Sequence, residues 1–507
     1  MLTHRFVSGT HRRLSFRFWF GLLLFALILP LAPATVHAQT QRKSVTDLTA
    51  TELMSLRRGV AHMMDRNSAP RGSADFRRSW IYWANMHDHF GRDCAGAIVG
   101  TGMGGVQTWI ASNADERATW CRCEHGTVQF LTWHRMFLWY FERVLQEAAG
   151  DPSLRLPYWD YETDAQLPAA YRDATYVNEQ SQTVPNPLRV NARWPSLNNG
   201  TAHLSSFVTS TATAMTDTTF DPFNSDLEQS PHNNVHCAVT TGGCPNGGLM
   251  GSVPASALDP IFYAHHTNID RLYECWLQGD EPGRLPSNPT QLNTVFTFVD
   301  ADGSTVKRRV RNMLTTTQLG YTYAAGGGCP PSLAQVSRAA ENRPVPEQVL
   351  ASVGPTRLDP TVTAVPLAMS AQGRQALAAQ RQGAPTSSRI YVTIEGLQYD
   401  EAPGVLYNVF LRGAGEKREQ IGVINFFGLA SSRSADTRHA AHLHTRGSFR
   451  FDITDAVKQL DISGDAPLSL VFEPTTGLSD SSPETVAREM NPQANVRFES
   501  ARLVTAR

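Results

Sequence analysis

Hydrophobic positions recur at steps of three and four residues in three long stretches of the chain. These are "TATELMSLRRGVAHMMDR" (49–66), "FLTWHRMFLWYFERVLQEAAG" (130–150) and "DPIFYAHHTNIDRLYECW" (259–276). The spacing places apolar side chains on one face of a helix, and Thr49 and Gly150 are typical of a helix start and a helix end. We therefore predict helices in these stretches, with a further helical segment at 232–237.

The period of the pattern changes after residue 388. "SRIYVTIEGL" (388–397), "VLYNVFLRG" (405–413) and "LSLVFEP" (468–474) are short β-branched or aromatic runs divided by turn residues, which predict a small antiparallel sandwich or barrel. Residues 336–388 are rich in Pro, Ala and Gln and favour a linker. The prediction is an α+β multidomain chain, with a mainly helical domain at 39–335 and an all-β domain at 389–507.

The first 38 residues differ from the rest of the chain. A positively charged start, "HRRLSFRFWF", precedes the apolar run "GLLLFALILPLAPA" and small residues before Gln39, which is the pattern of a secretory signal peptide. Arg12 and Arg13 give a partial twin-arginine pattern, so both export routes stay open. No later run approaches the ~18 apolar residues of a membrane span. We expect export to the periplasm or the extracellular space.

Composition excludes some partners and raises a question about cysteine. A net charge of −1 over 507 residues, with 18% charged side chains, gives no basic excess for nucleic acid. The seven cysteines all lie between Cys94 and Cys329. In an oxidising compartment six of them can form three disulfides, and the seventh needs another explanation.

Histidines gather in two groups within the helical half. The groups are His87, His89, His125 and His134, and His232, His236, His265 and His266. His232 and His236 are four apart and share one helix face, which suits a chelate. His125 and His134 are nine apart and would point in opposite directions on one helix, so His125 must precede the helix if both bind one metal ion.

Two sets of three imidazoles, presented by helices with aromatic flanks, predict a metal pair in a helical bundle. Ligation by imidazole without an acidic ligand favours copper or zinc. The zinc hydrolase motif H-E-x-x-H is absent from the sequence, so copper is the better choice.

Three motifs carry a family resemblance. "CEHGTVQFLTWHRMFLWYFE" resembles the copper A signature of the tyrosinase and catechol oxidase (polyphenol oxidase) family of type 3 copper proteins, and "PHNNVH" and "DPIFYAHHTNIDRLYECW" resemble its copper B signature. "GYTY" (320–323) is similar to the Tyr-x-Tyr motif that closes the catalytic domain, and the final strands resemble the β-domain of latent relatives. The resemblance, to a bacterial form with this β-domain, implies a central four-helix bundle holding two copper ions, with O2 as co-substrate.

The resemblance also implies a ligand set. Copper A takes His87, His125 and His134, and copper B takes His232, His236 and His266. His89 competes for the first position, but "ANMH" favours His87. Cys123 matches a cysteine that many relatives join to the following histidine, here His125, by a thioether, which would account for the odd cysteine; the alternative is a disulfide to Cys121 or Cys94.

Further roles follow by position. Glu228 matches a glutamate that holds a water near the copper pair, and Asn233 matches an asparagine that orients this water to deprotonate a monophenol; the alternatives are a surface acid and a helix-start amide. Val253 falls thirteen residues before His266, where plant relatives often carry a phenylalanine over copper A. A smaller residue there predicts easier substrate access.

His265 is expected at the edge of the pocket, where it packs against substrate, and Asp270 is expected to steady the site as an acceptor behind the ligands. The β-domain is expected to pack on its own active site as a lid, with Phe426, Phe427 or Leu429 inserted into the mouth. "HAAHLH" (439–444) is a polar strand or loop edge or, less favoured, a second metal patch.

The predicted function is an exported dicopper oxidoreductase that hydroxylates monophenols at the ortho position and oxidises o-diphenols to o-quinones. Its partners would be small phenols, with no nucleic acid and no membrane span. The alternatives are a catechol or o-aminophenol oxidase without action on monophenols, and an oxygen carrier of the haemocyanin kind. Haemocyanins repeat such units along a chain, and a single copper pair behind a signal peptide argues against that role.

Overall fold

A computed structural model describes residues 40–87, 111–120, 122–245, 247–278, 283–324, 329, 347–381, 389–432, 447–460, 462 and 467–506. The predicted signal peptide, His89, Cys94, Cys121 and the histidines of "HAAHLH" lie outside these residues. Within them no helix is long and apolar enough to cross a membrane.

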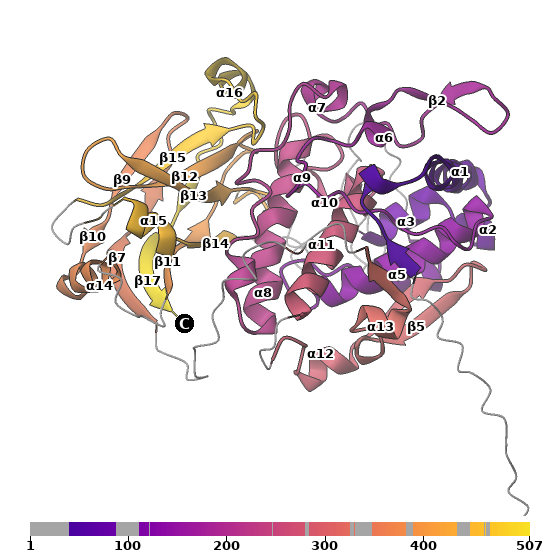
Figure 1. Cartoon of the computed structure of the whole chain (residues 1–507), viewed down its shortest axis with the longest axis horizontal. Helices are drawn as coiled ribbons and strands as arrows, with labels where there is room; N and C mark the ends of the chain where they lie inside the picture. The colour runs from indigo at the N-terminus through magenta and orange to yellow at the C-terminus, as the bar shows by residue number, and fades with distance from the viewer. Residues whose placement is uncertain are drawn as a thin grey trace, which may run out of the picture. The chain divides into compact units, whose positions relative to one another are not determined.

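The first part of the chain is mainly helical (Figure 1). Its helices are α1 (Ala50–Asp65), α2 (Ala74–Arg77), α3 (Trp80–His87), α4 (Ala114–Thr119), α5 (Phe130–Ala149), α6 (Ala169–Arg172), α7 (Pro195–Asn199), α8 (Phe220–Leu227), α9 (Asn234–Val239), α10 (Val253–Ser256), α11 (Ile261–Leu277), α12 (Pro289–Asn293) and α13 (Thr316–Leu319). Short turns η3 (Ala214–Thr216) and η4 (Glu228–Asn233) flank α8, and β2 (Thr175–Val177), β3 (Thr183–Pro185), β4 (Val295–Val299) and β5 (Thr305–Arg309) form two hairpins.

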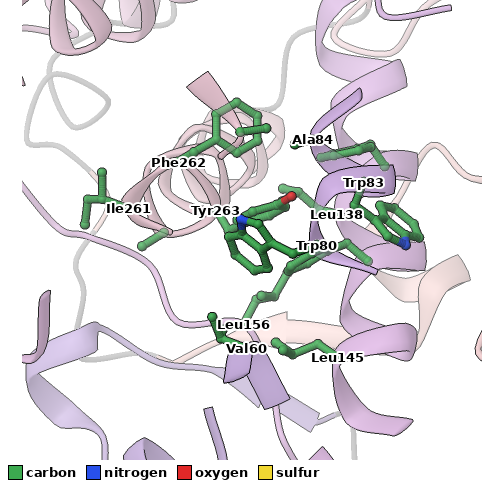
Figure 2. Packing of buried hydrophobic residues seen from close by; sticks show 14 of the residues in the cluster. Val60, Trp80, Trp83, Ala84, Leu138, Leu145, Leu156, Ile261, Phe262 and Tyr263 are labelled. Atoms are coloured by element: carbon green, nitrogen blue, oxygen red, sulfur yellow. The ribbon is translucent and has the colours of Figure 1, made fainter. Parts of the chain in front are cut away.

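Aromatic packing fixes the helices that carry the histidines. The Tyr263 ring of α11 stacks on Phe141 of α5 with centroids 3.7 Å apart, and lies 5.1 Å from Trp80 of α3. Figure 2 shows Trp80 and Tyr263 side by side among the buried aliphatic residues. Because all three rings are buried, small rotations of one helix against another would open voids in a close-packed core. The packed helices therefore hold the histidine side chains in fixed relative positions.

The ends of the helical part pair with each other. Strand β1 (Thr40–Arg42) lies parallel to β6 (Tyr321–Tyr323), which is the Tyr-x-Tyr segment. Arg42 is fully buried, and its guanidinium donates to Glu142 at 2.9 Å and to Asp270 of α11 at 3.2 Å. The pairing thus ties both ends of this part of the chain to helices α5 and α11.

The second part forms a sandwich of two antiparallel sheets, as predicted (orange to yellow in Figure 1). One sheet has the order β10-β7-β17-β11-β14 and the other β13-β12-β15-β9. The strands are β7 (Gln348–Val353), β8 (Thr356–Arg357), β9 (Thr363–Pro366), β10 (Ala368–Met369), β11 (Arg389–Leu397), β12 (Leu406–Arg412), β13 (Arg418–Ile424), β14 (Gly447–Asp452), β15 (Ser469–Thr475), β16 (Arg497–Phe498) and β17 (Ser500–Ala506), with helices α14 (Ala371–Arg381), α15 (Thr454–Gln459) and α16 (Pro483–Glu489).

The structure corrects the predicted linker at 336–388. Residues 348–381 contain β7–β10 and α14: β7, β9 and β10 belong to the two sheets of the sandwich, and β8 pairs separately with β16. Their strands are short, and their partners lie far along the chain: β7 pairs with β17 and β9 with β15. Local patterning could not reveal them, because a short strand is stabilised by its neighbours and not by its own sequence.

Candidate metal centre

Three of the predicted histidines meet at the end of helix α3. His87 is the last residue of α3, His125 lies in the loop before α5, and His134 lies in α5. Their ring centroids are 4.9 Å (His87 to His125), 5.1 Å (His125 to His134) and 5.5 Å (His87 to His134) apart. Helix α5 begins at Phe130, so His125 precedes it, as chelation with His134 requires.

The second set lies on α9, on the turn before it and on α11. The Nε2 atom of His266 lies 3.2 Å from Nε2 of His232 and 3.4 Å from Nε2 of His236. Two nitrogens bound to one ion at ~2.0–2.1 Å with tetrahedral angles are about 3.4 Å apart. His266 is therefore spaced from both His232 and His236 as in a metal site, and all three nitrogens lie within 4.8 Å of one another.

The two sets are adjacent. The rings of His134 and His266 are nearly parallel, 17° apart, with centroids separated by 4.6 Å. All six histidines of the predicted ligand set are buried. The arrangement suits two ions held side by side between α3, α5, α9 and α11, as the sequence predicted for a four-helix bundle.

Oxygen atoms behind the site orient four of the rings. The Nδ1 atoms donate to Val253 O for His87 (3.2 Å), Phe130 O for His134 (2.8 Å), Asn233 Oδ1 for His232 (2.8 Å) and Met250 O for His236 (2.9 Å). An imidazole that donates through Nδ1 presents the lone pair of Nε2 on its other side. The tautomer needed for metal binding is thus fixed by the surroundings.

Burial also sets the protonation of these rings. It lowers the pKa of His134 and of His236 to about 3, and lowers those of His232 and His266 well below the ordinary value. A metal ligand must be neutral, because a protonated imidazole has no free lone pair. The centre is therefore prepared for a cation at neutral pH.

Cys123 lies beside the first set. Its Sγ is 3.4 Å from Nδ1 of His125 and 3.8 Å from Nε2 of His134. The two disulfides within the described residues join Cys237 to Cys244 and Cys275 to Cys329. The position of the thiol is compatible with the thioether to His125, which stays a prediction.

Glu228 and Asn233 lie close to the histidines in different ways. Glu228 is buried and accepts a hydrogen bond from the N–H of Gly126 at 2.6 Å, next to His125. Burial raises the pKa of Glu228 to about 8, although this hydrogen bond acts in the opposite direction. Asn233 uses its amide oxygen to accept from His232, and its amide nitrogen lies 3.4 Å from Oε1 of Gln229.

The other predicted residues have these places. Val253 is buried at the start of α10, and its carbonyl holds His87. His265 is fully buried between Tyr161, at 5.7 Å between centroids, and His232, at 5.4 Å. The proposed roles of Val253 and His265 in substrate access stay predictions.

Asp270 accepts hydrogen bonds from two arginines and two tyrosines. Arg135 donates at 2.5 Å, Arg42 at 3.2 Å and Tyr321 at 2.5 Å, and the Tyr323 hydroxyl is the fourth donor. Burial alone would raise the pKa of Asp270, but Arg135 and Arg42 together hold it below its ordinary value. The side-chain partners described for Asp270 are arginines and tyrosines, and its role behind the metal ligands stays a prediction.

Phe427 of the β-domain reaches the histidines. Its ring stacks on His236 with centroids 4.1 Å apart and planes 14° apart, and lies 5.8 Å from His232 and 6.2 Å from His125. Phe426 instead packs inside the β-domain, 5.8 Å from Tyr399. Among the lid candidates Phe426, Phe427 and Leu429, Phe427 is the residue whose ring contacts the histidines in the described part of the chain.

Sequence reasoning missed the polar contacts that hold this segment. The amide nitrogen of Asn425 donates to Oδ1 of Asn234 at 2.8 Å and to the carbonyl of Gln229 at 3.3 Å. Asn425 is next to Phe426, and Asn234 is next to Asn233. Because the two asparagines are 191 positions apart in the chain, no local sequence pattern indicates that they pair.

Comparisons with known proteins agree with this geometry. Residues 77–193 and 173–279 match the family described as the common central domain of tyrosinase, 286–328 match the polyphenol oxidase middle domain, and 346–488 match a domain of unknown function. A tyrosinase of Hahella sp. is 28% identical over 83% of this chain and 91% of the relative. A chloroplastic polyphenol oxidase of Malus domestica is 24% identical over 70% of this chain and 65% of that enzyme.

Solved structures show the same fold. Latent apple tyrosinase superimposes with a TM-score of 0.56 at 18% identity, over 92% of this chain and 97% of its own. Tyrosinase from Burkholderia thailandensis gives a TM-score of 0.53 at 15% identity, over 91% and 100%. With the tyrosinase domain, the polyphenol oxidase middle domain and two clusters of buried histidines, this chain belongs to the tyrosinase and polyphenol oxidase family of type 3 copper proteins, and its cofactor is a pair of copper ions.

Proposed function

We propose that this protein is a latent tyrosinase, which uses O2 to hydroxylate monophenols next to their oxygen and to oxidise o-diphenols to o-quinones. The observation that carries the proposal is the buried carboxyl group of Glu228 beside His125, because a monophenol must lose its proton before hydroxylation. We assign copper A to His87, His125 and His134, and copper B to His232, His236 and His266.

When bound there, the copper pair supplies the redox chemistry and binds O2. The protein's own groups handle the proton and the aromatic ring. Glu228 accepts the phenolic proton through a water molecule held at its carboxylate. Burial raises the pKa of Glu228 to about 8; the positive charge of bound metal ions would lower this pKa and so favour the ionised base at neutral pH.

Phe427 indicates where a substrate ring fits. Its phenyl group, stacked 4.1 Å from His236, has the size of a phenol ring. We infer that a substrate occupies this place face to face with His236, and that Phe427 must leave first. The resting protein is therefore latent, with its own β-domain in the substrate position.

One observation bears on a second function, oxidation of catechols or o-aminophenols without action on monophenols. The amide oxygen of Asn233 accepts the hydrogen bond from His232, which leaves it one lone pair with which to orient a water at Glu228. If this lone pair does not reach the water, Glu228 alone handles the phenolic proton.

The test compares Phe427→Ala with Leu429→Ala in the copper-loaded full chain. Both residues are buried in the same turn, but Phe427 stacks on His236. Removing the Phe427 ring should raise the rate of catechol oxidation by about tenfold or more, because a larger fraction of the molecules can bind substrate. The same preparation should hydroxylate the matching monophenol.

Three results would contradict the proposal: a protein that binds zinc in preference to copper, activity of Phe427→Ala no higher than that of Leu429→Ala, or oxidation of the catechol with no hydroxylation of the monophenol. The last result would establish the second function. Export stays a proposal, and N-terminal sequencing of protein recovered outside the cytoplasm, starting at Gln39, would support it.

A further inference from the structure

Asn425 of the β-domain fills a small polar site on the helical part. Its side-chain nitrogen donates to Oδ1 of Asn234 at 2.8 Å and to the backbone carbonyl of Gln229 at 3.3 Å, and both asparagines are 1% exposed. Backbone groups fix which end of the Asn425 amide is the nitrogen. The N–H of Phe427 donates to its Oδ1 at 3.2 Å, and the carbonyl of Gln229 can meet only its donor end. Asn234 must therefore face Asn425 with its oxygen.

Asn234 is held in this orientation by the helical part itself. Its side-chain nitrogen donates to Oγ of Ser230 at 3.1 Å, and the Ser230 hydroxyl donates to the carbonyl of Ser210 at 2.7 Å. Because the donor end of Asn234 is already used, this side chain offers an acceptor toward the β-domain. We call Oδ1 of Asn234 and the carbonyl of Gln229 the oxygen pair. None of the hydrogen bonds behind Asn234 involves the β-domain, so the oxygen pair keeps its geometry when the β-domain leaves.

The oxygen pair lies next to the place that the Phe427 ring occupies. Asn425 precedes Phe427 by two residues, and the Phe427 ring stacks on His236 with centroids 4.1 Å apart. When the β-domain leaves, the oxygen pair loses the amide nitrogen that it binds in the latent protein. A substrate whose ring takes the place of Phe427 can restore these hydrogen bonds if its chain carries a donor.

The chemistry of the oxygen pair selects the kind of donor. An ammonium group has three N–H donors and no acceptor, so it can bind both oxygens at once, and its charge strengthens each hydrogen bond. A carboxylate would bring its own oxygens against the pair. In Phe427 two carbons separate the ring from the backbone N–H, which contacts only the Oδ1 end of the Asn425 amide. At ~1.5 Å a bond, an ammonium on about three carbons would reach the Nδ2 position.

We propose that Asn234 and the carbonyl of Gln229 form a subsite for a primary ammonium group on the chain of the phenolic substrate. The proposal rests on the proposed function, because the subsite becomes free only when Phe427 leaves. The preferred substrates are then phenols and catechols with an aminoalkyl chain. In the latent protein the amide of Asn425 takes the place of this ammonium, as the ring of Phe427 takes the place of the phenol.

The first experiment measures specificity in the copper-loaded full chain that carries Phe427→Ala. The value of kcat/KM is determined for a catechol with an aminopropyl chain and for the same catechol with a propyl chain. The ratio of the two values does not depend on the fraction of open molecules, because both substrates need the same open state. Adding Asn234→Leu should lower this ratio by about tenfold, since the oxygen that meets the ammonium is gone. The matched control is Asn425→Leu, which breaks the same hydrogen bond from the side of the β-domain and should leave the ratio unchanged.

The second experiment measures binding without turnover. Phenylpropylamine and phenylpropionate share the ring and differ in the charge at the end of the chain. Their affinities for copper-free Phe427→Ala are measured by isothermal titration calorimetry, and the amine should bind about tenfold more tightly. Adding Asn234→Leu should remove most of this difference, whereas Asn234→Asp, which keeps the shape and adds a negative charge, should increase it.

An unchanged ratio in Asn234→Leu, an equal fall in Asn425→Leu, or an unchanged preference for the amine in Asn234→Asp would each overturn the subsite. A preference that survives acetylation of the amine would overturn the ammonium as its ligand. If Phe427→Ala binds two copper ions but oxidises neither catechol, the proposed function fails instead, and the binding measurement still decides whether the subsite exists.

Discussion

The ligand histidines differ in what holds them from behind. His87, His134 and His236 donate to backbone carbonyls, whereas His232 donates to a side chain, that of Asn233. The sequence placed the histidines in two groups, because helix geometry is local, and the family resemblance chose three ligands in each group. The carbonyl acceptors could not be predicted, since every residue carries a carbonyl and only the fold selects one of them.

Glu228→Gln separates proton handling from oxidation. The amide keeps the shape and the hydrogen bond from Gly126 but is not a base, so hydroxylation of a monophenol should fall by about 10²-fold or more. Oxidation of the matching catechol should fall much less. Steady-state rates on both substrates, with Glu124→Gln as the nearby control, measure the effect.

Equal losses on the two substrates would show that Glu228 acts on copper binding or folding and not on the phenolic proton. Copper content of each variant, measured before the assays, distinguishes these cases. Glu124 is the nearby comparison: its carboxylate accepts from the hydroxyl of Thr127 at 2.9 Å, and its charge raises the pKa of Glu228, so Glu124→Gln should lower that pKa but leave the base in place.

At the scale of elements, helix α11 is held by charges as well as by aromatic packing. Asp270 neutralises two fully buried arginines, Arg42 from β1 and Arg135 from α5. The sequence predicted α5 and α11 from their periodicity. It did not predict β1, because a three-residue parallel pair has no pattern of its own and depends on β6, 281 positions away.

Asp270→Asn should destabilise the protein by about 3–5 kcal/mol, because two buried guanidinium groups lose their shared carboxylate. Chemical unfolding followed by tryptophan fluorescence measures the change. Glu274→Gln is the matched control on the same helix: Glu274 is about a quarter exposed and lies 3.4 Å from the same Arg135, so its removal should cost less than about 1 kcal/mol. Similar losses for the two variants would contradict the central role of Asp270.

At the scale of the whole molecule, the β-domain is held over the site by a buried ion cluster as well as by Phe427. Arg450 of β14 lies 2.9 Å from Asp217 and 2.6 Å from Asp226 of α8. Its guanidinium covers the Tyr391 ring at 3.7 Å, and Asp452 on the same strand faces Arg389. Sequence reasoning predicted a lid but not this cluster, because its charges come from segments more than 200 residues apart.

The cluster makes latency depend on pH. Burial first, and then repulsion by Asp226, raise the pKa of Asp217 well above its ordinary value; burial raises that of Asp226 too. The carboxyl groups of Asp217 and Asp226 face the single guanidinium of Arg450. While the β-domain is docked on the helical part, the pair therefore keeps a proton that two exposed carboxylates would release. Docking should therefore be strongest near the ordinary carboxyl pKa of ~4 and weaken as pH rises through the raised values.

The measurement is the activity of the copper-loaded full chain divided by that of Phe427→Ala at each pH from about 5 to 8. The ratio cancels the pH dependence of catalysis and should increase with pH. Asn at position 217 carries no titratable proton, so Asp217→Asn should make the ratio depend less on pH. Asp221→Asn, on the exposed side of α8, should leave the pH dependence of the ratio unchanged. A curve of Asp217→Asn parallel to that of wild type would contradict the role of the cluster.

The contacts of the β-domain extend to the backbone, where Ser205 donates to Gly477 and Ser479 donates to His203, each at 2.9 Å. No cysteine follows Cys329, so no disulfide can join the β-domain to the helical part. A cut after Cys329 and before residue 347 would therefore leave two fragments bound by reversible contacts alone, because the Cys275–Cys329 disulfide would lie within the helical fragment. Activation would then follow mass action: cleaved enzyme should gain activity with a delay after dilution, and added β-domain fragment should silence it again.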